Sequence, residues 1–465
     1  MISLDTDSEE RQGSSMRRLM IFLLFCLLLT AAAVGASAGE PGTGKDHPCI
    51  QIITEDGQPV LSREEYVPAV IQVFNCNEDF EMAEAAGVRI RGNSTAEQGE
   101  EKPYRIRFEK KHNMLGLHDG RKYRNWVLLR TYWHLCPDYM GFRLAKTIFE
   151  GKYYSSDCLF VNLYMNGRDL GIYLLCEQNQ AAKDRMDVFE PEEGETRTDI
   201  GYLLEMDNYP DDEHPGFSIG EKPYIEDIAG RKRVVKRQYY AIKSDVWSGE
   251  QEEYIKDWLT GAYNVLYEAA ANGRAMRLDE QLQAVPAEGM TAFEAVDELV
   301  DLESLADMLI LEELIQNYDV GAGSFYMAVD FTADSRYRKL TFLGPWDLSW
   351  GYTEPADGGY YAAAFQNHIQ GMDNSNPWFV LAMKLEGFRE MVRNRWRELS
   401  GSGVLRDTTR QVLADIEDLA GDLGEENAGK LEEGRKIVDY VNARIEWLDA
   451  QWNTDAEPDV GKTPR

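Results

Sequence analysis

The chain has 465 residues, of which 43% are hydrophobic, and it carries a formal net charge of −32 at pH 7. A chain of this length and hydrophobicity can bury one large core or two of ordinary size, which excludes a wholly disordered protein. The strong negative charge repels phosphate backbones, which argues against a nucleic-acid partner, and it gives no help in binding anionic lipid.

The first 38 residues resemble a bacterial Sec-type signal peptide. Arg17 and Arg18 precede the apolar run 19–29, and small residues follow up to Ala36-Ser37-Ala38. A basic start, an apolar middle and an A-x-A end are typical of secretory signals. We therefore expect cleavage after Ala38 and a protein that is secreted or held at the cell or spore surface, with no membrane contact after cleavage. A retained membrane anchor is the alternative, since the apolar stretch approaches spanning length.

Cysteine usage fits export only loosely. After residue 38 the chain keeps an odd number of cysteines: Cys49, Cys76, Cys136, Cys158 and Cys176. Their pairing cannot be deduced from sequence, and Cys49 with Cys76 is the first candidate because both flank early strand-like segments. The sequence contains no CxxC motif and no Cys/His cluster, which argues against a zinc site.

Strand signals dominate the first part of the chain. Residues 39–47 are rich in Gly, Pro and charge and predict a linker. Alternating or apolar runs then predict strands, and Asn166-Gly167 predicts the turn of a hairpin. The expected strands cover 50–53, 69–74, 88–91, 104–108, 159–165 and 170–175, with a helix at 139–150.

Helix signals dominate the second part. After the charged, loop-rich segment 183–236, interrupted by 201–205, Ser248 and Gln251 predict a capping box for a helix that stops at Gly273. A second helix is expected to begin at Asp301. Strands are expected at 325–329 and 340–343, a largely helical stretch at 376–451, and a polar tail at 453–465.

These patterns predict an α+β protein with one main domain. The domain is expected over 48–452, with a strand-rich small lobe at about 48–180 and a charged insert plus helical lobe at 181–452.

Two carboxylates flank the short hairpin of the second part. Asp319 precedes its first strand, and Asp347 follows its second strand, 340–343. Pro345 ends the strand ladder, and Trp346 can shield a dry pocket beside the Asp347 carboxylate. We expect the two carboxylates to converge on one point, where Mg²⁺ held by carboxylates and substrate oxygens would support phosphoryl transfer.

Spacing adds a weaker signal. Ser324 lies five residues after Asp319, the D-x-x-x-x-N spacing of kinase catalytic loops. On spacing alone a helix-end turn residue explains Asp319 better, and a turn-capping residue under a core Trp is the alternative for Asp347. The basic residues that could hold phosphates opposite these carboxylates are Arg91, Lys102, Arg105, Arg107 and Lys243, and Arg105 and Arg107 share one strand face.

Several segments resemble the spore coat protein H (CotH) kinase family in the order in which that family has them, over roughly residues 50–452. RGNS, KPYR and PWD in this order carry the resemblance. The segments are 91–95, 102–108, 126–129, 161–167, 171–177, 201–205, 317–319, 344–348 and 444–449.

This resemblance implies a fold and a chemistry. The implied fold is an atypical, reduced protein-kinase-like fold with a strand-rich N-terminal lobe and a helix-rich C-terminal lobe. The implied activity is transfer of phosphate from ATP to a Ser or Thr of a spore-coat or cell-surface protein, with Mg²⁺, or Mn²⁺ as the alternative metal.

The resemblance also implies roles for single residues. Asp319 would position the acceptor hydroxyl, and Asp347 would bind the metal, with Ser324 as a second ligand. The residues assigned to the nucleotide are Arg91, Lys102, Arg105, Glu177 at the end of the lobe-connecting hairpin, and Lys243.

Two departures from the family pattern keep other functions open. The family often carries Asn where this chain has Ser324, and a second acidic residue where it has Ser349. A hydroxyl is a neutral, weaker ligand of Mg²⁺, so a catalytically inactive structural protein of coat or envelope assembly is the first alternative. An extracellular carbohydrate-active enzyme with an aromatic groove is the second, since the chain has 24 Tyr and 10 Trp.

Overall fold

The computed structural model describes residues 41–92, 96, 102–130, 136–207, 214–220, 224–228, 231–235, 238–317, 319–359, 368–369, 372–373, 376–424 and 428–453. The expected signal peptide at 1–38 and most of the expected tail at 453–465 lie outside these residues. The chain divides after Thr43, and the features below belong to the unit that begins at Gly44. Within the described ranges, no helix is long and apolar enough to cross a membrane.

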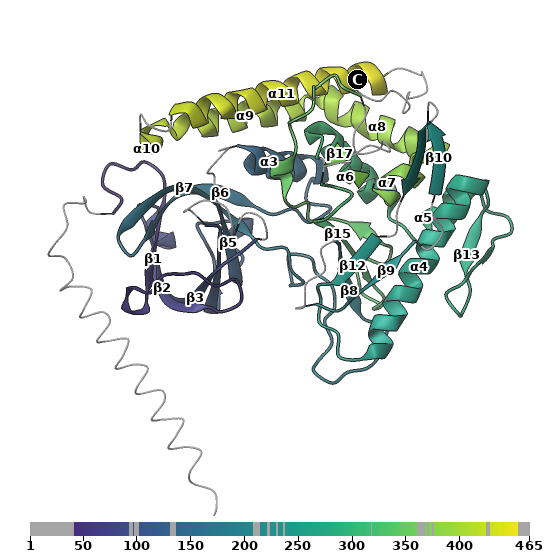
Figure 1. Ribbon diagram of the computed structural model, residues 1–465, viewed down its shortest axis with the longest axis horizontal. Helices are drawn as coiled ribbons and strands as arrows, with labels where there is room; N and C mark the ends of the chain where they lie inside the picture. Colours follow the sequence, from purple (N-terminus) through teal and green to yellow (C-terminus); the bar gives the residue numbers. More distant parts are fainter. Residues whose placement is uncertain are drawn as a thin grey trace, which may run out of the picture. The chain divides into compact units, whose positions relative to one another are not determined.

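Seven strands of the first part close into a barrel in the order β1-β2-β3-β4-β5-β7-β6 (Figure 1). Neighbours pair antiparallel except β1 and β6, which pair in parallel and complete the ring. The strands are β1 (Cys49–Thr54), β2 (Val67–Phe74), β3 (Met82–Ile90), β4 (Tyr104–His112), β5 (Tyr123–Arg130), β6 (Cys158–Met165) and β7 (Arg168–Glu177).

The hairpin turn expected at Asn166-Gly167 is confirmed. The two residues have φ values of 51° and 81°, the positive values that a two-residue type I′ turn requires. The α+β class is confirmed as well. The two-lobed, kinase-like arrangement stays a prediction, because what the structure shows for the strand-rich part is a closed barrel.

The strands of the barrel contribute side chains to two hydrophobic cores. Side chains that alternate along the strands fill the interior, among them Ile50, Ile71, Val88, Ile106 and Trp126. Side chains on the outer face of β5, β6 and β7, including Val127, Phe160 and Leu174, join a second core. That second core also contains residues of α3 (Pro137–Phe149), the helix between β5 and β6.

The Cys49–Cys76 disulfide suggested above is wrong. Both side chains are free thiols, as are the other described cysteines, Cys136, Cys158 and Cys176. Cys49 lies opposite Phe74 in the β1–β2 register, so Cys76 falls beyond the end of the paired strand. Proximity to a strand end in sequence did not indicate which residue would lie across from it.

A second sheet lies in the later part of the chain, in the order β16-β15-β8-β12-β9. Residues 183–236, expected to be loop-rich, contribute β8, β9 and the separate hairpin of β10 and β11. Only β8 has the continuous apolar run of a buried strand, so hydrophobic pattern could not reveal the others. The strands are β8 (Gly201–Met206), β9 (Gly216–Ile219), β10 (Tyr224–Ile228), β11 (Arg231–Val235), β12 (Gln238–Ile242), β15 (Phe325–Asp330) and β16 (Thr341–Phe342).

The helices begin and end largely where the sequence predicts. Ser248 and Gln251 form the expected capping box of α4, and Gly273 ends that helix in the left-handed conformation. Asp301 caps α6 by accepting a hydrogen bond from the Ser304 backbone N–H. The helices are α4 (Gly249–Asn272), α5 (Ala292–Asp297), α6 (Leu302–Ile315), α7 (Pro377–Ala382), α8 (Glu386–Ser402), α9 (Val404–Asp418), α10 (Ala420–Leu423) and α11 (Ala428–Trp452). Two further short hairpins are β13 (Met276–Leu278) with β14 (Ala284–Pro286), and β17 (His368–Ile369) with β18 (Met372–Asp373).

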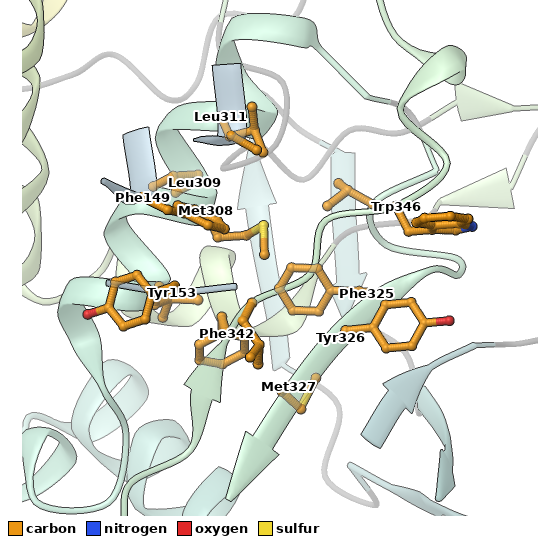
Figure 2. Packing of buried hydrophobic residues seen from close by; sticks show 14 of the residues in the cluster. Phe149, Tyr153, Met308, Leu309, Leu311, Phe325, Tyr326, Met327, Phe342 and Trp346 are labelled. Carbon is orange, nitrogen blue, oxygen red and sulfur yellow. The ribbon is translucent and has the colours of Figure 1, made fainter. Parts of the chain in front are cut away.

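Helix α6 is buried almost all round and forms the centre of the second core. Figure 2 shows Met308 of α6 pointing toward Phe325 of β15, and Met308, Leu309 and Leu311 belong to the same buried cluster as Phe325 and Phe342. The rings of Phe325 and Phe342 lie 5.5 Å apart between their centroids. The rings of Tyr326 and Trp346 extend away from this cluster (Figure 2), and both line the cavity described below.

One buried carboxylate joins the start of the barrel to the C-terminal helices. Asp422 in α10 accepts hydrogen bonds from the backbone N–H groups of Asp46 (2.6 Å) and His47 (2.9 Å). It also accepts one from the Asn162 side chain of β6 at 2.9 Å. Burial raises the pKa of Asp422, but these hydrogen bonds outweigh burial and leave the pKa lowered.

We expect Asp422→Asn to lower the free energy of unfolding by about 2–4 kcal/mol at neutral pH, because buried N–H donors lose a charged acceptor. A lowered folded-state pKa means that the stabilisation is complete above the unfolded-state pKa of about 4 and is lost as the pH falls further. Urea unfolding of both proteins across this range should therefore show a difference that shrinks in acid. A difference that stays constant with pH would contradict the role given to the carboxylate.

Candidate functional site

A cavity of about 900 Å³ is lined by the outer face of β3 and β4 and by residues of the second sheet. Six cationic side chains line it, against two carboxylates, Glu64 and Glu190. The cations are Arg63, Arg89, Arg91, Arg105, Arg107 and Lys243. In a protein with a net charge of −32, this concentration of positive charge marks a site for an anion.

Strand alternation explains why so many arginines face one cavity. On β3 and β4, Val88 and Ile106 point into the barrel, so their neighbours in the strands point outward. Arg89 and Arg105 lie directly opposite each other in the antiparallel register. Arg107 continues the outer face of β4, and Arg91 extends that of β3.

Lys243 reaches the cavity from the second sheet. Its Nζ lies 3.1 Å from the Glu205 carboxylate of β8 and 3.3 Å from His214 Nδ1. Glu205 is buried and pairs in register with Tyr326 of β15. The cavity therefore has a basic wall from the barrel and a mixed wall, with an ion pair, from the second sheet.

Asp347 lies in a tight turn at the edge of this cavity. It stands at the N-cap position of the short helix η4 (Leu348–Trp350), where its side chain makes no capping hydrogen bond. Its backbone angles are left-handed (φ 59°, ψ 46°), a conformation that Asp and Asn tolerate better than most residues. The preceding Trp346 lines the cavity, and the Arg91 guanidinium lies over its ring at 5.2 Å from the centroid. Burial raises the pKa of Asp347, while Arg91 counteracts that rise.

Asp319 and Ser324 occupy the loop that leads into β15. Burial and then the negative charge of Asp347 raise the pKa of Asp319 to about 6. Ser324 has φ 54° and directly precedes β15. The backbone N–H of Leu343 donates to the Tyr326 carbonyl at 3.4 Å, so the exit of β16 lies beside the start of β15. The Asp319 loop and the Asp347 turn thus share one end of the hairpin.

A further carboxylate in this neighbourhood went unrecognised in the sequence. Asp138 lies in the first turn of α3, where an acidic residue is ordinary. Burial and the nearby Asp347 raise its pKa to about 7, while Arg91 and the backbone N–H groups of Ser349 and Leu348 lower it. No sequence signal pointed to Asp138, because its proximity to Asp347 arises only when α3 packs on the η4 turn.

Two residues assigned to the nucleotide lie apart from the lining of this cavity. Lys102 Nζ donates to the Ala96 carbonyl at 2.8 Å. Glu177, at the end of β7, is fully buried and accepts from Arg185 Nε at 3.0 Å and from the Asp157 backbone N–H at 3.0 Å. Of the assigned nucleotide residues, Arg91, Arg105 and Lys243 line the cavity, whereas Lys102 and Glu177 are absent from its described lining.

The environment of Glu177 indicates a structural role in joining the barrel to the segment that follows it. His118 Nδ1 lies 2.8 Å from its carboxylate. The Glu177 carboxylate accepts a hydrogen bond from His118 and thereby raises the pKa of the imidazole. The Arg185 guanidinium stacks on Tyr123 at 3.7 Å from the ring centroid. These contacts fix residues 178–181, which line the cavity.

We expect Asp319→Asn to stabilise the ligand-free protein at neutral pH. Because the pKa of Asp319 is raised to about 6, the folded state disfavours the charged carboxylate above the unfolded pKa of about 4, by on the order of 1–3 kcal/mol. The gain in unfolding free energy should shrink as the pH falls through about 6 and vanish below about pH 4, where both states hold the proton.

Asp330 provides the matched control for this measurement. Its buried carboxylate accepts from the Phe189 backbone N–H at 2.8 Å and from the Thr332 hydroxyl at 2.6 Å. Asp330→Asn should therefore destabilise the protein in the same urea titrations. If Asp319→Asn also destabilised at neutral pH, Asp319 would be an ordinary structural carboxylate.

Comparison with known families identifies the chain. The family described as CotH kinase protein matches residues 88–447, which is most of the chain and extends from β3 to α11. The protein therefore belongs to the CotH kinase family. No curated protein matches the chain. The matched range includes Asp138, Lys243, Asp319 and Asp347, whereas Arg63 of the cavity lies before it.

Proposed function

We propose that this CotH family protein is an exported kinase that transfers phosphate from ATP to a Ser or Thr hydroxyl of a spore-coat or cell-surface protein. One observation carries the proposal: an arginine-lined cavity of about 900 Å³, whose lining includes Arg91 and Trp346, lies beside two half-buried carboxylates, Asp319 and Asp347, that interact electrostatically. Cations that hold phosphates beside carboxylates that hold a metal and orient a hydroxyl are the parts that phosphoryl transfer needs.

The cavity suits a nucleoside triphosphate in size and charge. Its volume falls within the range of small-molecule sites. One guanidinium group can also donate two parallel hydrogen bonds to the oxygens of a phosphate. Arg91 and Arg105 would neutralise the phosphates from the barrel side, and Lys243 from the opposite wall. Trp346 and Tyr326, which also line the cavity, offer aromatic faces.

The donor set at the turn fits a hard divalent cation. Among the described residues no cluster of three or more His, Cys, Asp or Glu side chains is arranged to hold a metal. Mg²⁺, however, is usually held by one or two carboxylates together with substrate phosphates and water. Asp347 would hold the metal, with the Ser324 hydroxyl as a neutral ligand. When bound, the metal would neutralise charge that develops on the transferred phosphate.

Asp319 would accept a hydrogen bond from the acceptor hydroxyl and hold that hydroxyl in line with the phosphate. Its pKa, raised to about 6 by burial and by Asp347, leaves it mostly ionised at neutral pH and a better proton acceptor than an ordinary aspartate. Buried Glu312, whose pKa burial raises to about 8, interacts with Asp319 from the helix α6.

The direct test is transfer of labelled γ-phosphate from ATP to a mixture of Ser- and Thr-containing peptides. Asp319→Asn and Asp347→Asn should each lower kcat by at least about 100-fold, because each removes a group that acts on the reacting atoms. Asn keeps the left-handed turn at position 347. Asp407→Asn, at an exposed site on α9, is the control and should change nothing. Transfer that survives both active-site substitutions would refute the proposal.

The arginine wall is tested separately by ATP binding. The double variant Arg105→Gln with Arg107→Gln should raise the Kd for ATP about 10-fold or more and weaken its dependence on salt, because two cations leave the phosphate site. Calorimetric titration at low and high salt measures both effects. Arg410→Gln, on the exposed face of α9, is the matched control. An unchanged Kd in the double variant would place the nucleotide elsewhere.

A catalytically inactive scaffold is the second candidate, favoured by Ser324 and Ser349 at positions where the family often carries Asn and an acidic residue. It shares the fold and predicts neither phosphate transfer nor metal-dependent ATP binding. The same two experiments therefore distinguish the candidates, since a kinase gives both signals and a scaffold gives neither.

A further inference from the structure

The family pattern leaves Asp347 without its usual acidic neighbour, because Ser349 stands at that position. The structure brings a carboxylate to the same turn from another part of the chain. Asp138 lies in the first turn of α3, more than two hundred positions earlier in the sequence.

Close packing holds α3 against the Asp347 turn. The ring centroids of Phe142 and Trp346 lie 5.5 Å apart. The Tyr352 hydroxyl donates to the Pro137 carbonyl at 3.1 Å. Gly141 lies so close to Leu348 that a Cβ at position 141 would come within 2.5 Å of that side chain. The first two turns of α3 thus contact residues on both sides of Asp347.

One oxygen of Asp138 has no partner. Its Oδ1 has essentially no exposed surface and no hydrogen-bond partner, and a buried acceptor without a donor is costly and rare. Asp347 acts on the same carboxyl electrostatically, and Arg91 acts on both carboxyls. Two half-buried carboxyls, one of them with a buried Oδ1, beside one guanidinium leave room in the charge balance for a further cation.

A purely structural role explains only part of this arrangement. The backbone N–H groups of Leu348 and Ser349 interact with the Asp138 carboxyl, which would help to hold the η4 turn. That role needs an acceptor but no negative charge, and it leaves the buried Oδ1 unexplained. A carboxylate ligand of a divalent cation uses both the negative charge and the open oxygen.

We propose that Asp138 is a second carboxylate ligand of the divalent cation held by Asp347, and that it takes the place of the acidic residue missing at position 349. This inference rests on the proposed function, since it assumes a metal at Asp347. It assigns to the first turn of α3 a metal-binding role in addition to its packing role.

The test is binding of Mn²⁺ in the presence of ADP, measured by the loss of the free Mn²⁺ signal in electron paramagnetic resonance. Asp138→Asn keeps an acceptor for the Leu348 and Ser349 N–H groups but removes the charge, so we expect the Kd for Mn²⁺ to rise at least about 10-fold, or ~1.4 kcal/mol. Asp138→Glu should bind better than Asp138→Asn. Urea unfolding without metal checks that both variants fold.

Two further variants show whether the role of Asp138 or the proposed metal site itself fails. Asp301→Asn alters another helix N-terminal aspartate that accepts a backbone N–H, and it should bind Mn²⁺ as the wild type does. If Asp347→Asn abolishes binding while Asp138→Asn leaves the Kd unchanged, the role of Asp138 is overturned and the proposed metal at Asp347 stands. If the wild type itself binds no Mn²⁺, the proposed function fails and the role of Asp138 fails with it.

Discussion

A half-buried carboxylate is stabilised by a nearby cation, and for Asp347 that cation comes from a distant part of the chain. Arg91, at the end of a barrel strand, lies over Trp346 and opposes the rise that burial imposes on the pKa of Asp347. The contact also requires the barrel and the β15–β16 hairpin to keep a fixed relation, because a shift of either would leave the charge buried and unpaired. The packing of α3 on the turn and the hydrogen bonds of Asp422 to the start of the barrel serve the same requirement from two sides.

Positive charge is concentrated in one cavity of a chain whose net charge is strongly negative. The chain as a whole is strongly acidic, yet six cationic side chains face one cavity. The barrel makes this arrangement possible because alternate residues of β3 and β4 fill an apolar interior while their neighbours point to the cavity. A basic cavity in an acidic protein attracts anions locally, while the surrounding surface repels them. This arrangement favours a small polyanion that fits inside the cavity over an extended one such as nucleic acid.

Membership of the CotH kinase family and the local geometry answer different questions. The match over residues 88–447 shows membership of the family, and the resemblance of the sequence motifs implies the roles proposed for Asp319 and Asp347. It does not explain how a chain with Ser324 and Ser349 could hold a metal. The position of Asp138 offers a physical answer, in which a ligand is supplied from a different element at the same point in space. A carboxylate that balances the charge of a metal can come from any helix, strand or loop that reaches the site. It therefore need not stand at the same position in the sequence of every family member.

Local sequence pattern was enough to predict the α+β class, the helix starts at Ser248 and Asp301 and the turn at Asn166-Gly167, because each depends on residues close together in the chain. Long-range packing, in contrast, makes the strands close into a barrel, sets Cys49 opposite Phe74 and not Cys76, and forms strands from the charged segment 183–236. It also separated the basic residues into those that line the cavity, such as Arg105 and Lys243, and Lys102, which binds a backbone carbonyl instead. These outcomes depend on which residues meet across long stretches of chain, and local pattern carries no information about such meetings.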